Sequence, residues 1–473
     1  MQTTEQVLSE ILEEITPKKD ERTRIENLAK KLEQKVETAS ELLGVEAKVR
    51  LEGSVAKDTW LSEEPDIDIF MQVPPSIPRK SLGDICLKIA KKATEGSKQV
   101  ERFADHPYLE AYVKGVRVNI VPCYKTAKGE WLSATDRTPF HTDYVKKHLT
   151  EQMRSEVRLL KRFMKSIGVY GAEIKIGGFS GYLCELLILN YQSFLKTLKS
   201  FAKYKQRLIV DIENHYKERK GELPLLFREP LVIIDPVDKG RNVASAVQPQ
   251  KLYNFVAASR AFLKNPHNSF FYTPKTHILP VKELKTTLKN FGSDFLFLTF
   301  GKVNAVPDVF WGQLYKTQRS LRKLLELNDF CVLRDQSWSD EKTLSIFIFE
   351  LEQRSLSPVK KHLGPPLDRE NECESFLEKY RDNSCTVSGP YVENGRWIVE
   401  IKRKYVDAVT LINERLKNGG VNIGVADKIA KELSRKFHIF INEEIVGLYE
   451  KHHAFAEFLT DFLSGKPKWL ETT

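Results

Sequence analysis

The sequence has few cysteines, and their spacing is not that of a metal site or a disulfide framework. Six cysteines are scattered over 473 residues, and no two of them form a Cys-x-x-Cys pair. This argues against a structural zinc site and against a disulfide-stapled fold. The first residues contain no apolar core of signal-peptide length. No apolar run approaches the ~18 residues that would suggest a membrane span. We therefore expect a cytoplasmic protein with no membrane partner.

Fixed-period repeats and low-complexity segments are also missing, whereas positive charge is in excess. Hydrophobic residues make up 41% of the chain, which supports folded cores. The length suits about three domains at ~150 residues each. The net charge of +10 favours a polyanionic partner such as nucleic acid. Many basic proteins bind nothing anionic, so charge alone leaves the partner open.

The spacing of apolar residues predicts an α+β protein of several domains. Residues 1–147 form a small unit of mixed sheet and helices, with a strand at 66–73 and a helix at 81–96. Ser81 is the expected N-cap of that helix. Residues 148–265 change to long helices with broad apolar stripes, which predicts a helical central domain.

Residues 266–473 return to alternating strands and helices. A helix at 309–328 between short strands predicts a ferredoxin-like or RNA-recognition-motif-like β-α-β-β unit. The composition of residues 358–370, PVKKHLGPPLDRE, is typical of a linker. A mainly helical tail follows it.

The stretch DIDIF places two acids one residue apart in an apolar strand. Side chains alternate along a strand, so Asp66 and Asp68 face one way while Ile67 and Ile69 face the core. Two carboxylates at close range repel each other unless a cation lies between them. Two divalent ions about 3.5–4 Å apart suit in-line phosphoryl transfer, and Mg²⁺ prefers such oxygen ligands.

A glycine–serine pair precedes these acids in GSVAKDTWLSEEPDIDIF. Gly53 would let a phosphate approach the backbone, and the hydroxyl of Ser54 can donate to its oxygens. Asp-x-Asp alone is usually a solvated strand face. The combination with Gly-Ser is much more specific and predicts a nucleotide site.

The Gly-Ser and Asp-x-Asp elements together resemble the signature of the nucleotidyltransferase superfamily. Longer blocks resemble the archaeal class I CCA-adding enzymes over essentially the whole chain: FADHPY, VPCY, TDRTPFHT, EVRLLKRFMKSIGVYGAE, GFSGYLCELLI, DPVDKGRNVA, GPYVENGRW and FLTDFLSGKPKWL. The resemblance implies a catalytic palm at 1–147, a helical domain at 148–265 that completes the nucleotide pocket, and a tRNA-binding body and tail at 266–473. It also implies a homodimer that adds C, C and A to the 3′ end of tRNA from CTP and ATP with Mg²⁺.

The resemblance also implies roles for individual residues. Gly53 and Ser54 would meet the triphosphate, and Asp66 and Asp68 would hold the metal. The nucleotide's phosphates, ribose and base would be met by His141, Lys161, Tyr170 and Arg241. Without the resemblance, we favour a solvated lysine for Lys161 and a half-buried tyrosine for Tyr170, and His141 is equally an ordinary loop histidine. Arg241 has the strongest independent case, because a guanidinium suits phosphates and base edges.

One position departs from the family pattern. Members carry a third carboxylate on the strand before VPCY, where this chain has Asn119, on the same strand face as Arg117. An amide oxygen can coordinate Mg²⁺ but brings no negative charge. One missing unit charge at ~4 Å corresponds to about 4 kcal/mol at an effective dielectric near 20, which would slow the chemistry roughly 10³-fold.

Three interpretations of Asn119 are open: a deliberate Asp→Asn change, a natural weak enzyme, or an RNA-binding paralogue. The rest of the motif is intact, so we favour an attenuated transferase. A poly(A) or oligoadenylate polymerase with the same palm is a further rival, and the long blocks argue against it.

Basic residues in the last third of the chain are candidates for RNA contacts. Four lie on the predicted helix LYKTQRSLRKLLE, and Arg403 follows the strand RWIVEIK: the helical ones are Lys316, Arg319, Arg322 and Lys323. Such spacing gives one basic face. A merely solvated face is the alternative interpretation.

Overall fold

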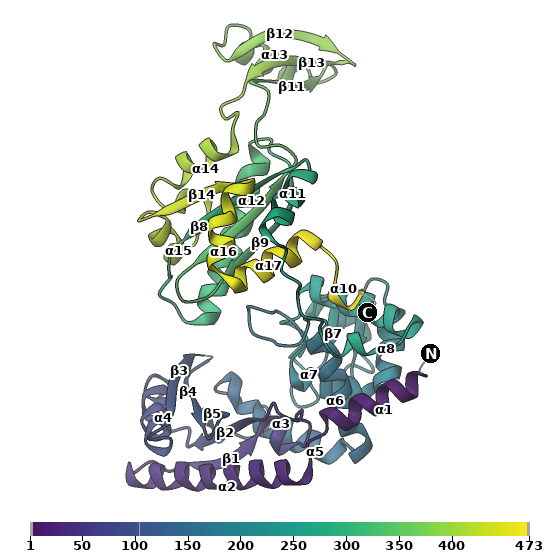
Figure 1. Cartoon of the computed structure of the whole chain (residues 1–473), viewed down its shortest axis with the longest axis vertical. Coiled ribbons are helices and arrows are strands. Elements are labelled where there is room, and N and C mark those ends of the chain that lie inside the picture. The colour runs from purple at the N-terminus through teal and green to yellow at the C-terminus, as the bar shows by residue number, and fades with distance from the viewer. Residues whose placement is uncertain (1–2, 104, 471–473) are drawn as a thin grey trace. The chain divides into compact units, whose positions relative to one another are not determined.

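A computed structural model describes residues 3–103 and 105–470 (Figure 1). The chain forms two compact units, Met1–Lys275 with Lys466–Thr473, and Thr276–Gly465. No helix in the described part of the chain is both long and apolar enough to cross a bilayer. The division expected at residues 147 and 265 stays a prediction, since the first unit spans both segments.

The palm is a five-stranded sheet in the order β1-β2-β5-β4-β3. Strands β2 and β5 are parallel, and the other neighbours are antiparallel. The strands are β1 Lys48–Glu52, β2 Asp66–Val73, β3 Lys98–Phe103, β4 Pro107–Val113 and β5 Val116–Tyr124. The alternation predicted for DIDIF is confirmed, because Ile67 and Ile69 are fully buried while Asp66 and Asp68 are not.

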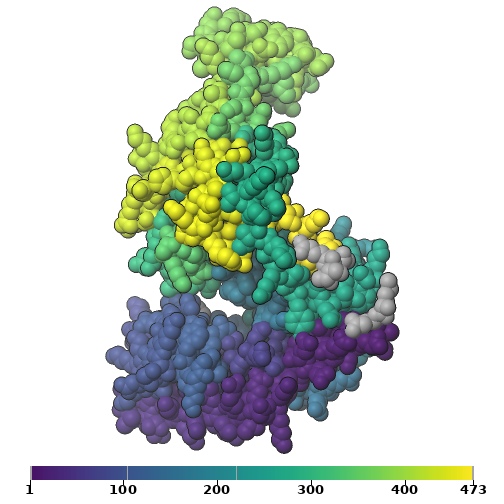
Figure 2. Space-filling model, in the orientation of Figure 1, coloured from purple at the N-terminus to yellow at the C-terminus, as the bar shows by residue number. Residues whose placement is uncertain are grey.

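Two helices, α2 (Lys19–Leu42) and α4 (Arg79–Ala93), pack on the apolar face of this sheet. The space-filling view shows the purple residues of α2 lying along the blue palm (Figure 2). The opposite sheet face carries the acids. The N-cap prediction was wrong, because α4 begins two residues before Ser81 and its N-cap is Pro78. The ring of Pro78 fixes φ at −60°, which already directs the chain into the helix.

The helical part of the first unit is built around aromatic side chains. Its helices are α1 Thr4–Ile15, α5 Thr138–His148, α6 Glu151–Ser166, α7 Gly181–Tyr191, α8 Phe194–Ala202, α9 Leu223–Leu226 and α10 Pro249–Lys264. Phe163 contacts five other phenylalanine rings, and Trp469 stacks on one of them, Phe270, at 5.7 Å between ring centres. A short parallel pair, β6 (Leu208–Val210) and β7 (Leu231–Ile233), leads into the loop at 234–245.

The second unit contains a four-stranded antiparallel sheet in the order β14-β8-β10-β9. Its strands are β8 Asp294–Phe300, β9 Val332–Ser339, β10 Ser345–Leu351 and β14 Phe437–Ile441. Apolar residues on both faces form two cores. They pack against the helices α11 Val281–Asn290, α12 Pro307–Leu327, α14 Ala408–Leu416, α15 Asp427–Leu433, α16 Val446–Lys451 and α17 His453–Ser464. The order β8-α12-β9-β10 confirms the predicted β-α-β-β unit.

The linker predicted at 358–370 is wrong. Residues Val359–Pro366 are strand β11 of a three-stranded sheet ordered β11-β13-β12, with α13 (Glu370–Tyr380) packed on it. The partners are β12 Thr386–Glu393 and β13 Arg396–Lys402. The charged residues, glycine and prolines of this segment are typical of a linker, which is why the strand was not predicted. Gly364 is required by packing in the strand. A Cβ there would lie 2.7 Å from the ring of Phe376.

Candidate active site

The two acids of β2 lie beside two polar side chains of β5. The parallel register pairs Asp66 with Arg117 and Asp68 with Asn119. The amide Nδ2 of Asn119 donates to Asp68 Oδ1 at 2.9 Å. Burial raises the pKa of Asp68 to about 6, and the hydrogen bond from Asn119 opposes that rise. Without a cation, the negative charge of Asp68 is therefore only partly stabilised by its surroundings.

Gly53 begins the short helix α3 (Gly53–Ala56) and lies directly against Asp68. Its φ of +71° is in the left-handed region, and a Cβ would lie 1.9 Å from Asp68 Oδ2. Both the conformation and the space thus require glycine. Ser54 follows it, and its carbonyl accepts a hydrogen bond from the Thr59 amide at 2.9 Å.

The donor set fits a divalent cation of the magnesium type. Asp66, Asp68 and Asn119 offer carboxylate and amide oxygens, and a side chain at position 53 would fill the space beside Asp68. No group of three or more His, Cys, Asp or Glu that could hold a metal occurs among residues 3–103 and 105–470. The amide of Asn119 is thus the third oxygen-bearing group beside the carboxylates of Asp66 and Asp68.

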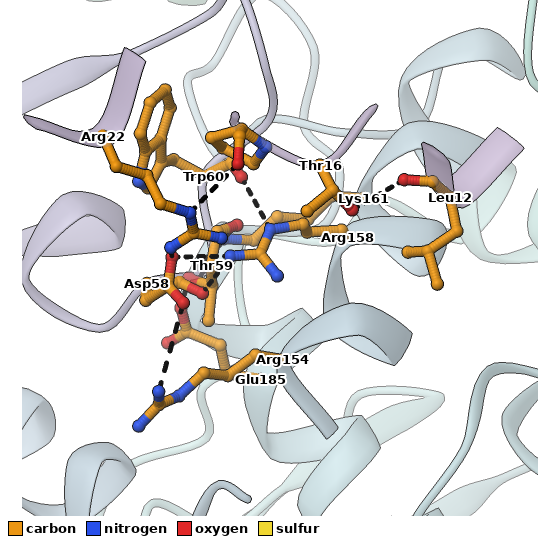
Figure 3. A network of polar contacts seen from close by, with 11 residues as sticks. Leu12, Thr16, Arg22, Asp58, Thr59, Trp60, Arg154, Arg158, Lys161 and Glu185 are labelled. Carbon is orange, nitrogen blue, oxygen red and sulfur yellow. Dashed lines mark hydrogen bonds and ion pairs between the residues drawn. The ribbon is translucent and has the colours of Figure 1, made fainter. Parts of the chain in front are cut away.

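Lys161 is not a solvated lysine. Its side chain on α6 is 2% exposed, and its Nζ donates to the carbonyl and the hydroxyl of Thr59, both at 3.0 Å (Figure 3). Glu185 on α7 accepts from Lys57 at 2.6 Å and from the Thr59 hydroxyl at 2.7 Å. Burial lowers the pKa of Lys161, and the carboxylate of Glu185 opposes this. One buried acid thus faces two lysines, which leaves an excess positive charge.

Tyr170 and Lys161 both lie beside Gly181. A Cβ on Gly181 would lie 3.0 Å from the Tyr170 hydroxyl and 3.6 Å from Lys161 Nζ. Burial raises the pKa of Tyr170 well above its usual value, so the phenol stays neutral and can donate a hydrogen bond.

His141 and Arg241 meet at a single buried acid, Asp235. His141 Nε2 lies 2.8 Å from Asp235 Oδ2, and Arg241 Nη1 donates to the same oxygen at 2.7 Å. The Tyr182 hydroxyl donates to the other oxygen at 3.1 Å, and its ring stacks on His141 at 4.1 Å between centres. Hydrogen bonds from His141 and Arg241 outweigh desolvation and lower the pKa of Asp235 to about 2.

A further network joins the palm to α6. Asp58 accepts from Arg158 at 2.6 Å and is also paired with Arg22 and Arg154 (Figure 3). Arg158 is 2% exposed and donates to the carbonyls of Trp60 and Asp58 at 3.0 and 2.7 Å. These bonds hold the 53–60 segment, with Gly53 and Lys57, against the helical part of the same unit.

Three family descriptions match consecutive parts of the chain. Residues 26–149 match "Nucleotidyltransferase domain", and residues 155–272 match "tRNA nucleotidyltransferase, second domain". Residues 292–442 match "CCA-adding enzyme, C-terminal domain".

Two similar proteins, each named CCA-adding enzyme, match this chain over nearly their whole length. The CCA-adding enzyme of Methanosarcina barkeri is 38% identical over 93% of this chain and 94% of its own. The CCA-adding enzyme of Methanothermobacter thermautotrophicus is 36% identical over 96% of this chain and 97% of its own. The chain belongs to the CCA-adding enzyme family. The resemblance stated from the motifs is thereby confirmed, and with it the α+β multidomain fold.

Solved structures are similar to a smaller part of the chain. That of E. coli MS115-1 CdnC with ATP covers 56% of this chain and 94% of its own, at 19% identity and a TM-score of 0.43. A structure of the Cid1 poly(U) polymerase covers 56% and 96%, at 17% identity and a TM-score of 0.43.

The basic residues that the sequence suggested as RNA contacts differ in exposure and in ion pairing. On α12, Lys316, Arg319 and Lys323 are exposed. Arg322 is instead engaged with Asp335 and with Glu326, the latter at 2.8 Å. Arg403 is paired with Asp329.

Sequence reasoning missed several residues of the site. Asp235 lies in the same block as Arg241, and Lys57 lies three residues after Ser54, so both were within quoted motifs. Tyr182 and Glu185 also lie within one of these blocks, GFSGYLCELLI, but their roles depend on contacts with Asp235 and Lys57, which are distant in sequence.

Proposed function

We propose that this chain adds C, C and A to the 3′ end of tRNA, without a nucleic-acid template, from CTP and ATP. The observation that carries this is the Gly53–Asp68 contact on a palm sheet, in a chain that belongs to the CCA-adding enzyme family. The relatives named above are CCA-adding enzymes, and they match this chain over almost their full length. The RNA 3′-oxygen forms a bond to the α-phosphate and gives its proton to water, and the bond between the α-phosphate and the leaving pyrophosphate breaks.

In this scheme each group of side chains has a task. Gly53 and Ser54 receive the triphosphate, whose charge is balanced by Lys161 and by the hydrogen-bonding phenol of Tyr170. His141 and Arg241, both held by Asp235, meet the nucleotide from the other side. Support comes from the burial of Lys161, His141 and Asp235, since polar groups that are fixed before binding need little reorganisation.

Asp66, Asp68 and Asn119 are proposed to hold Mg²⁺ in a two-metal site. Two bound ions would supply charge neutralisation at the attacking and the leaving oxygen. Asn119 brings no charge to this site, and we propose that it attenuates the transferase. Partner and location are also proposals: the tRNA acceptor end contacts Lys316, Arg319, Arg322, Lys323 and Arg403, and the protein is a cytoplasmic homodimer.

One assay tests the proposed activity. The protein is incubated with tRNA transcripts that end before the first C, after it, or after the second C, together with labelled CTP or ATP and Mg²⁺. We expect ordered addition of C, C and A, and no A before both cytidines. Long A-tails on any RNA would instead indicate a poly(A)-type polymerase.

An RNA-binding paralogue is the second candidate, because both acids of β2 are occupied by side chains of β5. Tight tRNA binding with no incorporation at any Mg²⁺ concentration would favour it and overturn the proposed function.

A further inference from the structure

Arg117 forms a two-pronged ion pair with Asp66 on the open face of the palm sheet. Its Nε donates to Asp66 Oδ1 at 2.7 Å, and its Nη2 donates to the other carboxylate oxygen, Oδ2. Both oxygens of Asp66 are therefore taken by one guanidinium. A planar guanidinium binds a carboxylate in this fork geometry, which a lysine cannot reproduce.

The strand register fixes this pairing. Asp66 and Arg117 are direct partners in the parallel β2–β5 ladder, two residues before Asp68 and Asn119. Side chains of direct partners lie on the same face at short range. The other two arginines of this sheet have other acidic partners. Arg50 on β1 is paired with Glu52 at 2.9 Å and with Asp143 at 2.7 Å, and Arg102 on β3 is paired with Glu110 at 2.8 Å. Arg117 is thus the arginine that faces the acids of β2.

We propose that Arg117 is an internal competitor of the divalent cation at Asp66, so that its guanidinium must leave before an ion can use that carboxylate. This rests on the proposed function, which assigns Asp66 as a metal ligand. Without metal, the guanidinium of Arg117 then occupies the carboxylate of Asp66 in place of the cation. Asp68, which accepts from the neutral amide of Asn119 rather than from a guanidinium, stays the more available acid for the first ion.

The competition is weak enough to be overcome in solution. The side chains of Arg117 and Asp66 are 47% and 36% exposed, so water screens the pair and can replace either partner. A competitor of this strength is expected to weaken cation binding roughly 2- to 5-fold. It therefore raises the cation concentration needed for activity without abolishing the site.

The test measures Mn²⁺ binding to the full chain without nucleotide or RNA, by titration calorimetry and by the signal of free Mn²⁺ in electron paramagnetic resonance. Arg117→Gln is compared with Arg102→Gln, which removes the same charge from the same sheet but breaks a different pair. Arg117→Lys keeps the charge and loses the fork. Asp66→Asn reports whether Asp66 binds the ion at all.

We expect Mn²⁺ to bind roughly 2- to 5-fold more tightly to Arg117→Gln, and less than about 1.5-fold more tightly to Arg102→Gln. Arg117→Lys should fall between the wild type and Arg117→Gln. Equal affinities for the two Gln variants would overturn the competition while leaving the metal site intact. If Asp66→Asn and Asp68→Asn bind Mn²⁺ as well as the wild type does, the metal assignment of the proposed function fails instead. Should Arg117→Gln not fold, an affinity of Arg117→Lys equal to that of the wild type would also overturn the competition.

Discussion

Gly53 lies so close to Asp68 that a methyl group on its α-carbon would fall 1.9 Å from Asp68 Oδ2. The contact joins the start of α3 to the middle of β2, and so joins the Gly-Ser element to the acid pair. Two motifs separated by a dozen residues thus form one site. The closeness of backbone to carboxylate is also what lets a phosphate and a cation share this place.

Gly53→Ala should therefore damage the site more than the fold. The new methyl must push Asp68 aside, and the left-handed φ adds about 1 kcal/mol of strain. We expect nucleotide incorporation to fall by roughly 10² or more, since misplaced catalytic groups have effects of that size. The control is Gly44→Ala, because Gly44 has a similar φ of +66° with no atom within 4 Å of the added Cβ. Similar losses of activity in both variants would contradict this explanation.

Asn119→Asp should increase the rate of incorporation. A third carboxylate restores a unit charge at ~4 Å, and an effect of about 4 kcal/mol would raise the rate roughly 10³-fold. Without a cation the same change places an acid next to Asp68, so the melting temperature should fall in EDTA and recover with Mg²⁺. Asn371→Asp on α13 is an exposed change of equal charge and should do neither. An unchanged rate in Asn119→Asp would mean that Asn119 is not at the metal.

The local pattern of the palm was predictable, whereas its cross-strand chemistry was not. Strand alternation correctly assigned Ile67 and Ile69 to the core and set Asn119 on one face with Arg117. The pairing of Arg117 with Asp66, 51 residues apart in sequence, depends on the register of two parallel strands, which no local pattern determines. The same reason hid Asp235, whose role arises only when His141 and Arg241 converge on it.

Cation binding should depend on pH through Asp68. Burial raises the pKa of this carboxyl to about 6, so below that pH a cation must displace a proton from it. We expect the Mn²⁺ affinity to be constant above pH ~7 and to fall about tenfold per pH unit well below 6. Asn119→Ala removes the hydrogen bond that lowers this pKa, so the midpoint should move to higher pH. An affinity that stays constant from pH 5 to 7 would contradict the assignment of Asp68 as a ligand.

Asp235→Asn should weaken both the fold and nucleotide binding. The pKa of Asp235 is lowered to about 2, and a lowered pKa means that the ionised form stabilises the folded state. This contribution is complete above pH ~4 and is lost as the pH falls towards 2, and a shift of this size corresponds to about 2 kcal/mol. The free energy of unfolding of the variant, measured with urea, should be lower than that of the wild type by that amount at pH 7, and the difference should shrink below pH 4.

The same substitution loosens His141 and Arg241, so we expect KM for CTP to rise roughly tenfold, because a bond to a charged partner is lost. The matched control is Asp238→Asn in the same loop. The Asp238 carboxylate accepts from Arg137 at 2.7 Å, whereas Arg241 is bonded only to the backbone carbonyl of Asp238, at 2.9 Å, which the substitution keeps. That variant should keep its KM. A rise in KM of the same size in both variants would indicate that the whole loop, and not Asp235, positions the nucleotide.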